Sequence, residues 1–203
     1  METFLISAWL RPLHLAVLGK KTICLQTAPT DIDLWNAFKQ GNKESFAILF
    51  RRFYPLLIQY GGKLCPDVNQ VEDDIQELFF DLWQSRSDIQ VHSVKAYLLK
   101  ALKYKIFKTH RNKINTRLMQ VTEDMMFEIS HENFLIKKND DEQRSARIID
   151  ALRQLSSRQR EIIYLKLFQG LTYEELTDVM QINYQVARNL FYEAIKSIRK
   201  ALS

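Results

Sequence analysis

Five side chains near the C-terminus have the chemistry to contact DNA and recur at helical spacing: Gln185, Arg188, Asn189, Tyr192 and Lys196. Counted from the first, their offsets of three, four, seven and eleven residues place them on one face of a helix. Amide side chains can pair with adenine and arginine with guanine, whereas lysine and tyrosine can contact phosphate. The pattern indicates a DNA-reading helix, but it also fits an amphipathic hairpin with a solvated polar face. This segment alone leaves both interpretations open.

Two helices are expected to position this face. Thr172 and Glu175 form a Thr-x-x-Glu capping box, so the first helix should begin at Tyr173 and end near Gln181. Asn183 is the expected cap of a longer second helix, along which apolar residues recur at helical spacing. A short helix, a tight turn and a longer helix form the outline of a helix-turn-helix.

Opposite charges are segregated into two neighbouring stretches in the first half of the chain. Residues 67–84 carry six acidic side chains and no Lys or Arg, on a helical pattern with an apolar stripe. Residues 86–117 carry nine basic side chains against the single acid Asp88, interleaved with aromatic rings. Cations release counterions from phosphates and rings stack on exposed bases, so this composition suits a nucleic-acid groove. The alternative is a helix whose basic side chains are merely solvated and whose aromatic rings belong to the core. The acidic helix directly before it favours the nucleic-acid interpretation, because neighbouring helices of opposite charge indicate two different binding partners.

The composition predicts an all-α protein without catalytic chemistry. Of 203 residues, 46% are apolar, while glycine and proline number only 5 and 4 and helical periodicities are long. The net charge of +5 is modest. Cys24 and Cys65 are solitary, which predicts neither a disulfide nor a metal site and fits a reducing cytoplasm. The sequence has no phosphate-binding loop, metalloprotease motif or nucleophile elbow. We therefore expect no enzyme activity, catalytic residue, metal, cofactor or small-molecule substrate.

Residues 1–30 carry no readable function. Their two apolar patches are interrupted by Arg11 and Pro12 and lack the leading positive charge of a secretory signal. Neither patch approaches the roughly 20 apolar residues of a transmembrane helix. We interpret this segment as a disordered extension or as the product of a start codon placed too far upstream, with a short membrane-associating helix as the alternative.

Glycine, proline and capping residues divide the first helical block. Asp31 begins a helix that Gly41 should stop. Asn42 caps the next helix, which Pro55 should kink or split and which should end before Gly61.

The second helical block follows an irregular, acidic connector. It should open with a helix from Arg144 to Leu155, followed by a capping box of Ser156 and Gln159 and a helix stop at Gly170. The predicted architecture is two small helical domains, at 31–115 and 144–203, joined by a flexible linker at 116–143. The second domain should contain four helices, including the helix-turn-helix.

Two parts of the chain resemble domains 2 and 4 of the extracytoplasmic-function (ECF) sigma factors of the sigma-70 family. The resemblance to domain 2 is carried by DLWNAFKQGNKESFAILFRRFYPLL, VEDDIQELFFDLWQ and VKAYLLKALKYKIFKTHRNK. The resemblance to domain 4 is carried by LRQLSSRQREIIYLKLFQGLTYEELTDVMQINYQVARNLFYEAIKSIRKAL. The matches cover roughly residues 31–113 and 146–202, in the family's order and spacing, which is far more specific than a lone helix-turn-helix.

The resemblance implies an alternative sigma factor that binds core RNA polymerase and directs promoter recognition, melting and transcription initiation in the cytoplasm. The acidic helix would dock on the clamp coiled coil of the large polymerase subunit, through Asp74, Gln76, Glu77, Phe80 and Trp83. The loop 86–94, with a pocket for a flipped-out base, and the helix after it would open and hold the minus-ten element, through Arg86, His92, Lys95, Lys100, Lys103, Tyr104, Lys108 and Arg111. The minus-thirty-five element would be read in the major groove by Asn183, Tyr184, Gln185, Arg188, Asn189, Tyr192 and Lys196. A membrane-anchored anti-sigma factor is implied as a further partner, and the linker would run near the active-site cleft of the polymerase.

Four positions depart from the family pattern. Gln181 stands where the turn often has glycine, so a positive φ there would be strained. Leu190 and Glu193 stand where basic residues are common, and Tyr104 stands where asparagine is frequent, so the sequence preference should differ.

The competing hypothesis is a helix-turn-helix transcriptional regulator that acts without the polymerase core. It explains the C-terminal motif but not the acidic helix placed before a basic aromatic one. A nucleic-acid enzyme is a more distant alternative, which the missing catalytic constellation argues against.

Overall fold

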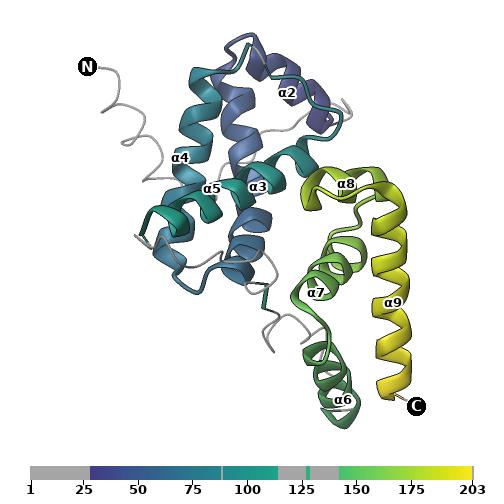
Figure 1. The fold of residues 1–203 in the computed structure, drawn as a ribbon. Helices are drawn as coiled ribbons and strands as arrows, with labels where there is room; N and C mark the ends of the chain where they lie inside the picture. Colours follow the sequence, from purple (N-terminus) through teal and green to yellow (C-terminus); the bar gives the residue numbers. More distant parts are fainter. Residues whose placement is uncertain (1–27, 88, 114–126, 129–141, 203) are drawn as a thin grey trace.

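The computed structural model describes residues 28–87, 89–113, 127–128 and 142–202, with the side chains of 111–113 and 142–146 left undescribed. Its elements are α2 (Asp31–Lys39), α3 (Lys43–Leu64), α4 (Val68–Gln84), α5 (Val94–Lys113), α6 (Glu142–Arg153), α7 (Ser157–Ile163), the π-helix η4 (Tyr164–Phe168), α8 (Tyr173–Met180) and α9 (Tyr184–Leu202). The all-α prediction is confirmed. Figure 1 shows two groups of helices, α2–α5 and α6–α9, lying side by side. The predicted extension at 1–30 lies outside the described residues up to position 27. The predicted linker at 116–143 also lies outside them, except for Phe127, Glu128 and residues 142–143, which form the start of α6 and not part of a linker.

Local capping signals are reproduced in the structure. Thr172, Ser156 and Asn42 each accept a hydrogen bond from a backbone N–H of the following helix, and the first two complete capping boxes with Glu175 and Gln159. Asp31 is the first residue of α2, but its cap is the residue before it, Thr30, which forms a capping box with Asp33. These caps satisfy donors that would otherwise be orphaned at the helix start.

The predicted end of α3 before Gly61 is wrong. The helix continues to Leu64 and is not split at Pro55. A Cβ on Gly61 would lie 2.3 Å from Val71 Cγ1 of α4, whereas Gly62 has open space around it. Gly61 is therefore present because α4 crosses α3 closely at this point, and not because the chain turns.

The turn between α8 and α9 is left-handed at Gln181. Its φ of 53° and ψ of 46° make it the one non-glycine residue with a positive φ in the described part of the chain. Gln181 therefore adopts the positive φ that glycine often takes at this position of the family. A Cβ in this conformation costs roughly 1–2 kcal/mol, which the contacts of the helix-turn-helix must offset.

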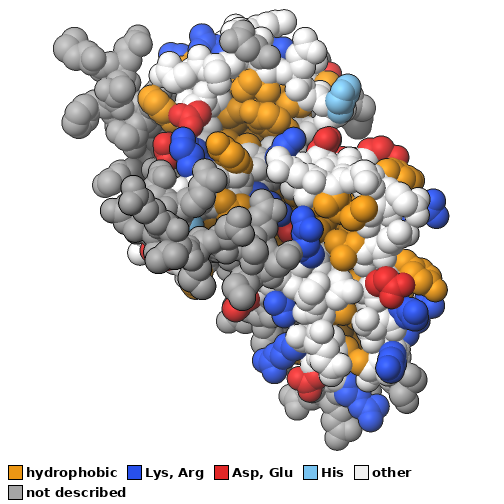
Figure 2. All heavy atoms as spheres, viewed as in Figure 1, with side chains coloured by type: hydrophobic (Ala, Val, Ile, Leu, Met, Phe, Trp, Pro, Cys, Tyr) orange, Lys and Arg blue, Asp and Glu red, His pale blue; other side chains and the backbone are white. Residues whose placement is uncertain are grey.

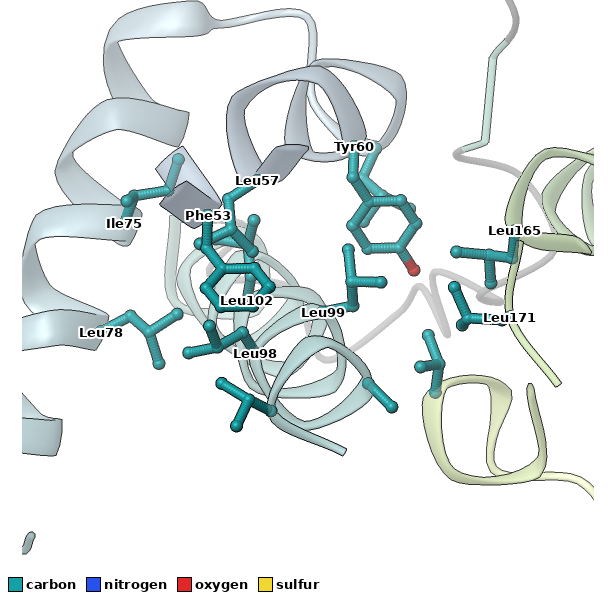
Figure 3. Packing of buried hydrophobic residues seen from close by; sticks show 14 of the residues in the cluster. Phe53, Leu57, Tyr60, Ile75, Leu78, Leu98, Leu99, Leu102, Leu165 and Leu171 are labelled. Atoms are coloured by element: carbon teal, nitrogen blue, oxygen red, sulfur yellow. The ribbon is translucent and has the colours of Figure 1, made fainter. Parts of the chain in front are cut away.

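The two helix groups share one hydrophobic core. One cluster of buried side chains contains residues of both groups, from Leu34 in α2 to Ala187 in α9. Helix α5 packs against α8 across the contact. Figure 3 shows Tyr60 of α3 pointing away from its own group, toward Leu165 and Leu171 of the second group. A smaller cluster joins α6, α7 and α9.

No helix among the described residues is long and apolar enough to cross a membrane.

Candidate nucleic-acid interface

The α9 face predicted to read DNA is exposed throughout. Asn183 accepts a hydrogen bond at Oδ1 from Val186 N–H at 2.8 Å and so fixes the start of the helix. Ala187 and Ala194 are fully buried on the opposite side, against the rest of the second group. The predicted contact residues all lie on the solvent side: Asn183, Tyr184, Gln185, Arg188, Asn189, Tyr192 and Lys196. Figure 2 shows Lys and Arg side chains spaced along the edge of the molecule that α9 forms.

Two amides on this face are coupled. Gln185 Nε2 donates to Asn189 Oδ1 at 2.9 Å, which leaves Oε1 of Gln185 as an acceptor and Nδ2 of Asn189 as a donor. Adenine presents a complementary set in the major groove, the N7 acceptor and the N6 donor. The pair is therefore a preorganised candidate for reading one A·T base pair.

Two departures from the family pattern have different consequences on α9. Leu190 is half-buried and packs against the core, so it is not part of the exposed face. Glu193 is exposed and lies 3.9 Å from Lys196 Nζ, a separation at which a surface pair contributes little. It still places a negative charge beside the DNA-facing row.

The acidic helix α4 presents part of its predicted polymerase-binding set. Gln76 and Glu77 are exposed, and Phe80 and Trp83 are half-buried. Trp83 packs on Phe46 with ring centroids 5.1 Å apart. An exposed amide and carboxylate beside two partly accessible rings can form a small apolar contact with a polar rim.

Asp74 is placed differently from its prediction. It is 1% exposed, since Val71, Asp74, Ile75 and Leu78 fall on the core-facing row of α4. Its Oδ1 accepts from Thr109 Oγ1 at 2.9 Å and from Gln70 Nε2 at 3.3 Å. Oδ2 has no partner in the described part of the chain.

Burial raises the pKa of the Asp74 carboxyl, against the opposing hydrogen bonds from Thr109 and Gln70. A buried carboxyl that hydrogen-bonds to α5 holds two helices together and does not present itself to a partner. In this conformation Asp74 acts as a structural residue between α4 and α5.

The predicted minus-ten residues fall into an accessible set and a covered set. Tyr104 is 63% exposed, and Lys108 and His92 are also exposed. Lys100 is half-buried, as is Arg86, whose guanidinium lies 4.7 Å from the Trp83 ring centroid. The side chain of Arg111 lies outside the described residues.

Lys95 and Lys103 form the covered set. Lys103 is 7% exposed, and its Nζ lies 3.0 Å from both Oε1 and Oε2 of Glu161 in α7. Lys95 Nζ donates to the carbonyl oxygen of Gln169, also in the second group. In this conformation neither ammonium is presented to DNA.

Sequence reasoning missed the residues that cover this side of α5. Tyr60 donates to Glu161 Oε1 at 2.6 Å, and Glu175 accepts from Ser93 Oγ. Glu161 stands on the apolar row of its helix, four residues before Leu165, and this position could have identified it as a buried carboxylate. Its partner could not be found by any local pattern, because Lys103 lies 58 positions away.

Two family models match the chain. "Sigma-70 region 2" matches residues 49–114, and "Sigma-70, region 4" matches residues 145–198. The two together span most of the residues on which the described helices lie.

Relatives are similar over most of their length. The ECF RNA polymerase sigma factor SigK of Mycobacterium ulcerans is 21% identical over 170 residues, which cover 80% of this chain and 88% of that protein. CnrH, solved in complex with the cytosolic domain of CnrY, is 20% identical with a TM-score of 0.56 and covers 85% of this chain and 96% of its own. RpoE of Bartonella quintana, solved with the anti-sigma factor NepR, is 19% identical with a TM-score of 0.56 and covers 78% of this chain and 97% of its own. The likeness to the two solved structures concerns the fold.

Proposed function

The chain belongs to the sigma-70 family as an ECF-type alternative sigma factor that directs transcription initiation, and from this premise we propose which surfaces carry out its steps. The exposed face of α9 reads the minus-thirty-five element. The accessible part of α4 binds core RNA polymerase, and α5 with the loop before it holds the opened minus-ten element. Members of this family are initiation factors without an enzymatic role, and we propose that this chain likewise has no catalytic activity and works in the cytoplasm, where the polymerase is.

The observation that carries the α9 assignment is that all seven predicted contact residues are exposed, and that five of them recur at helical spacing on one face of α9. The face is held by a capped helix-turn-helix, which presents a recognition helix to the major groove. Binding two promoter elements through two helix groups raises the effective concentration of each, so that each contact can be individually weak.

The test of the α9 assignment is transcription in vitro with core polymerase. Gln185→Ala and Asn189→Ala should each reduce transcription from a promoter with an intact minus-thirty-five element by roughly 10-fold. Ser197→Ala is the matched control, because Ser197 is exposed on the same helix but lies off the reading face. Equal effects of all three substitutions would contradict the assignment.

The assignment of α4 is tested by binding to core polymerase. Glu77→Lys should weaken binding, because it reverses a charge on the exposed acidic face. Glu44→Lys makes the same charge change at an exposed position of α3 and is the control. Undiminished binding by the Glu77 variant would show that α4 is not part of the interface. If the unmodified chain did not bind core polymerase, the result would favour the helix-turn-helix regulator instead.

We also propose an anti-sigma factor as a partner, anchored in the membrane. The support is that RpoE was solved with an anti-sigma factor and CnrH with the cytosolic domain of CnrY.

A further inference from the structure

A carboxylate lies within the exposed surface of α9 that we assign to DNA. The side chain of Glu193 is 54% exposed, and Asn189, one turn before it, belongs to the proposed reading face. Residues four apart lie on the same side of a helix, so Glu193 faces the groove together with Asn189. Its Oε2 lies 3.9 Å from Lys196 Nζ, and an exposed pair at this separation contributes little. The carboxylate therefore remains available to another partner.

A carboxylate in this place is costly unless DNA offers it a specific partner. The phosphates of the backbone attract cations and repel an anion. In the major groove, the groups that attract a carboxylate are the amino donors, N6 of adenine and N4 of cytosine. The adenine amino group lies between two acceptors, its own N7 and O4 of the paired thymine, whereas cytosine N4 has one such neighbour, O6 of the paired guanine. Cytosine is therefore the base that a carboxylate favours.

Arg188 lies on the opposite flank of the same surface. Five residues separate it from Glu193, which places the two side chains about 140° apart around the helix axis. The row that runs from Gln185 to Lys196 lies between them, so a helix in the major groove would direct Arg188 and Glu193 toward different strands. Five residues rise about 7.5 Å along a helix, so a guanine read by Arg188 and a cytosine read by Glu193 should lie within about two base pairs.

We propose that Glu193 is a specificity-determining residue, which selects cytosine in the minus-thirty-five element by accepting a hydrogen bond from the N4 amino group. The proposal rests on the proposed function of α9 and names the base that one further side chain reads. Guanine and thymine present acceptors to the major groove, so the same carboxylate works against them. Discrimination thus comes from attraction to one base and from repulsion of others.

A different role for Glu193 would be purely electrostatic. Beside a row of DNA-facing cations, a carboxylate can lower the affinity for every sequence alike, because it opposes the phosphate contacts. In that role, removal of the carboxylate strengthens binding to all sequences and leaves the base preferences as they are. In the reading role, removal abolishes the preference at one position.

The test is the selection of DNA by core polymerase that carries the full-length chain. The probe is a library of double-stranded DNA with a randomised segment, and the sequences that the polymerase retains are counted. Glu193→Ala should lower the preference for cytosine at one position by about 5-fold or more and leave the other positions unchanged. Glu193→Gln keeps an acceptor oxygen and adds a donor, so adenine should be accepted beside cytosine at that position.

Asp150→Ala is the matched control. Asp150 is an exposed acid of α6, and Arg153, three residues after it, lies 3.5 Å away from Nη1 to Oδ1. The spacing in sequence is that of Glu193 and Lys196. The control therefore removes the same charge from a similar surface pair on another helix, and the selected sequences should be unchanged. Circular dichroism of each variant establishes that the helices are intact.

Unchanged base preferences in the Glu193→Ala variant, with tighter binding to all sequences, would overturn the proposal in favour of the electrostatic role. Gln185→Ala in the same selection separates this result from a failure of the α9 assignment. If Gln185→Ala alters a position and Glu193→Ala alters none, α9 reads the element and only the role of Glu193 is overturned. If neither variant alters any position, the α9 assignment and the role of Glu193 are both overturned.

Discussion

The two candidate DNA-reading helices, α9 and α5, carry similar polar and basic side chains but present them differently. Every predicted contact residue of α9 is exposed, whereas Lys103 of α5 is 7% exposed and paired with Glu161. The difference follows from what faces each helix. One side of α9 meets alanines and apolar residues of its own group, while α5 lies between its own group and α8. The basic side chains of a helix are thus available to DNA only where no carboxylate from elsewhere in the fold pairs with them.

The largest expected difference between the helices concerns the stability of the fold. Lys103→Ala leaves Glu161 buried without its cation and should lower the free energy of unfolding by about 3–5 kcal/mol. Lys108→Ala, on the exposed side of the same helix, should change stability by less than about 0.5 kcal/mol. Urea unfolding of both variants makes the comparison, and similar losses for the two lysines would contradict a buried ion pair between Lys103 and Glu161.

Substitutions on the DNA-reading face of α9 should have smaller effects, each confined to one base position of the promoter. Arg188 is exposed on the α9 face, and Arg188→Ala should cost about 1–3 kcal/mol at one base position and relax the preference there. Transcription from promoters substituted at each minus-thirty-five position measures this, with Ser197→Ala as the control. If the variant discriminates every position as the unmodified chain does, Arg188 does not read a base.

The stability of the folded chain should also depend on pH through Lys63. This side chain is 5% exposed with Nζ 4.9 Å from the Tyr164 ring centroid, and burial lowers its pKa to about 8. Because the folded chain holds the Lys63 proton less tightly than the unfolded chain does, folding is least favourable below about pH 8 and becomes more favourable as pH rises toward the ordinary lysine pKa.

Lys63→Met should remove this dependence and stabilise the folded chain at pH 7 by on the order of 1 kcal/mol. Thermal unfolding at pH 7 and pH 9 measures it: the unmodified chain should gain stability between the two values, and the variant should not. A parallel gain in both proteins would show that another group is responsible.

The smallest expected effect concerns the turn of the helix-turn-helix. Gln181→Gly removes the Cβ from a left-handed residue and should raise the free energy of unfolding by about 1 kcal/mol or less, because glycine also has more freedom in the unfolded chain. Thermal unfolding measures the change, and the distance between the two helix groups should be unaffected. A loss of stability would show that the Gln181 side chain makes a compensating contact.

Local signals were sufficient to predict most of the fold. The caps at Thr172, Asn183 and Ser156 act within three residues, and the helices begin where these caps place them. Gly61 was misleading because a glycine that ends a helix and one that admits a neighbouring helix look alike in sequence. The π-helix at 164–168 has no signal that periodicity detects.

The exposure of a candidate site residue could be predicted only where it depends on the position of that residue on its own helix. On α9 the row of contact residues follows from spacing alone. On α4 and α5 the accessibility of Asp74 and Lys103 depends on Thr109 and Glu161, which lie 35 and 58 positions away. Contacts at such separations require the packed helices, so no reading of single segments could supply them.

The most direct measurement of the difference between covered and free lysines is their reactivity toward an amine-acylating reagent, followed by mass spectrometry. In the free chain, Lys103 should react at least about 10-fold more slowly than Lys108, because its Nζ is buried against Glu161. Equal rates for Lys103 and Lys108 would contradict the burial of Lys103 against Glu161.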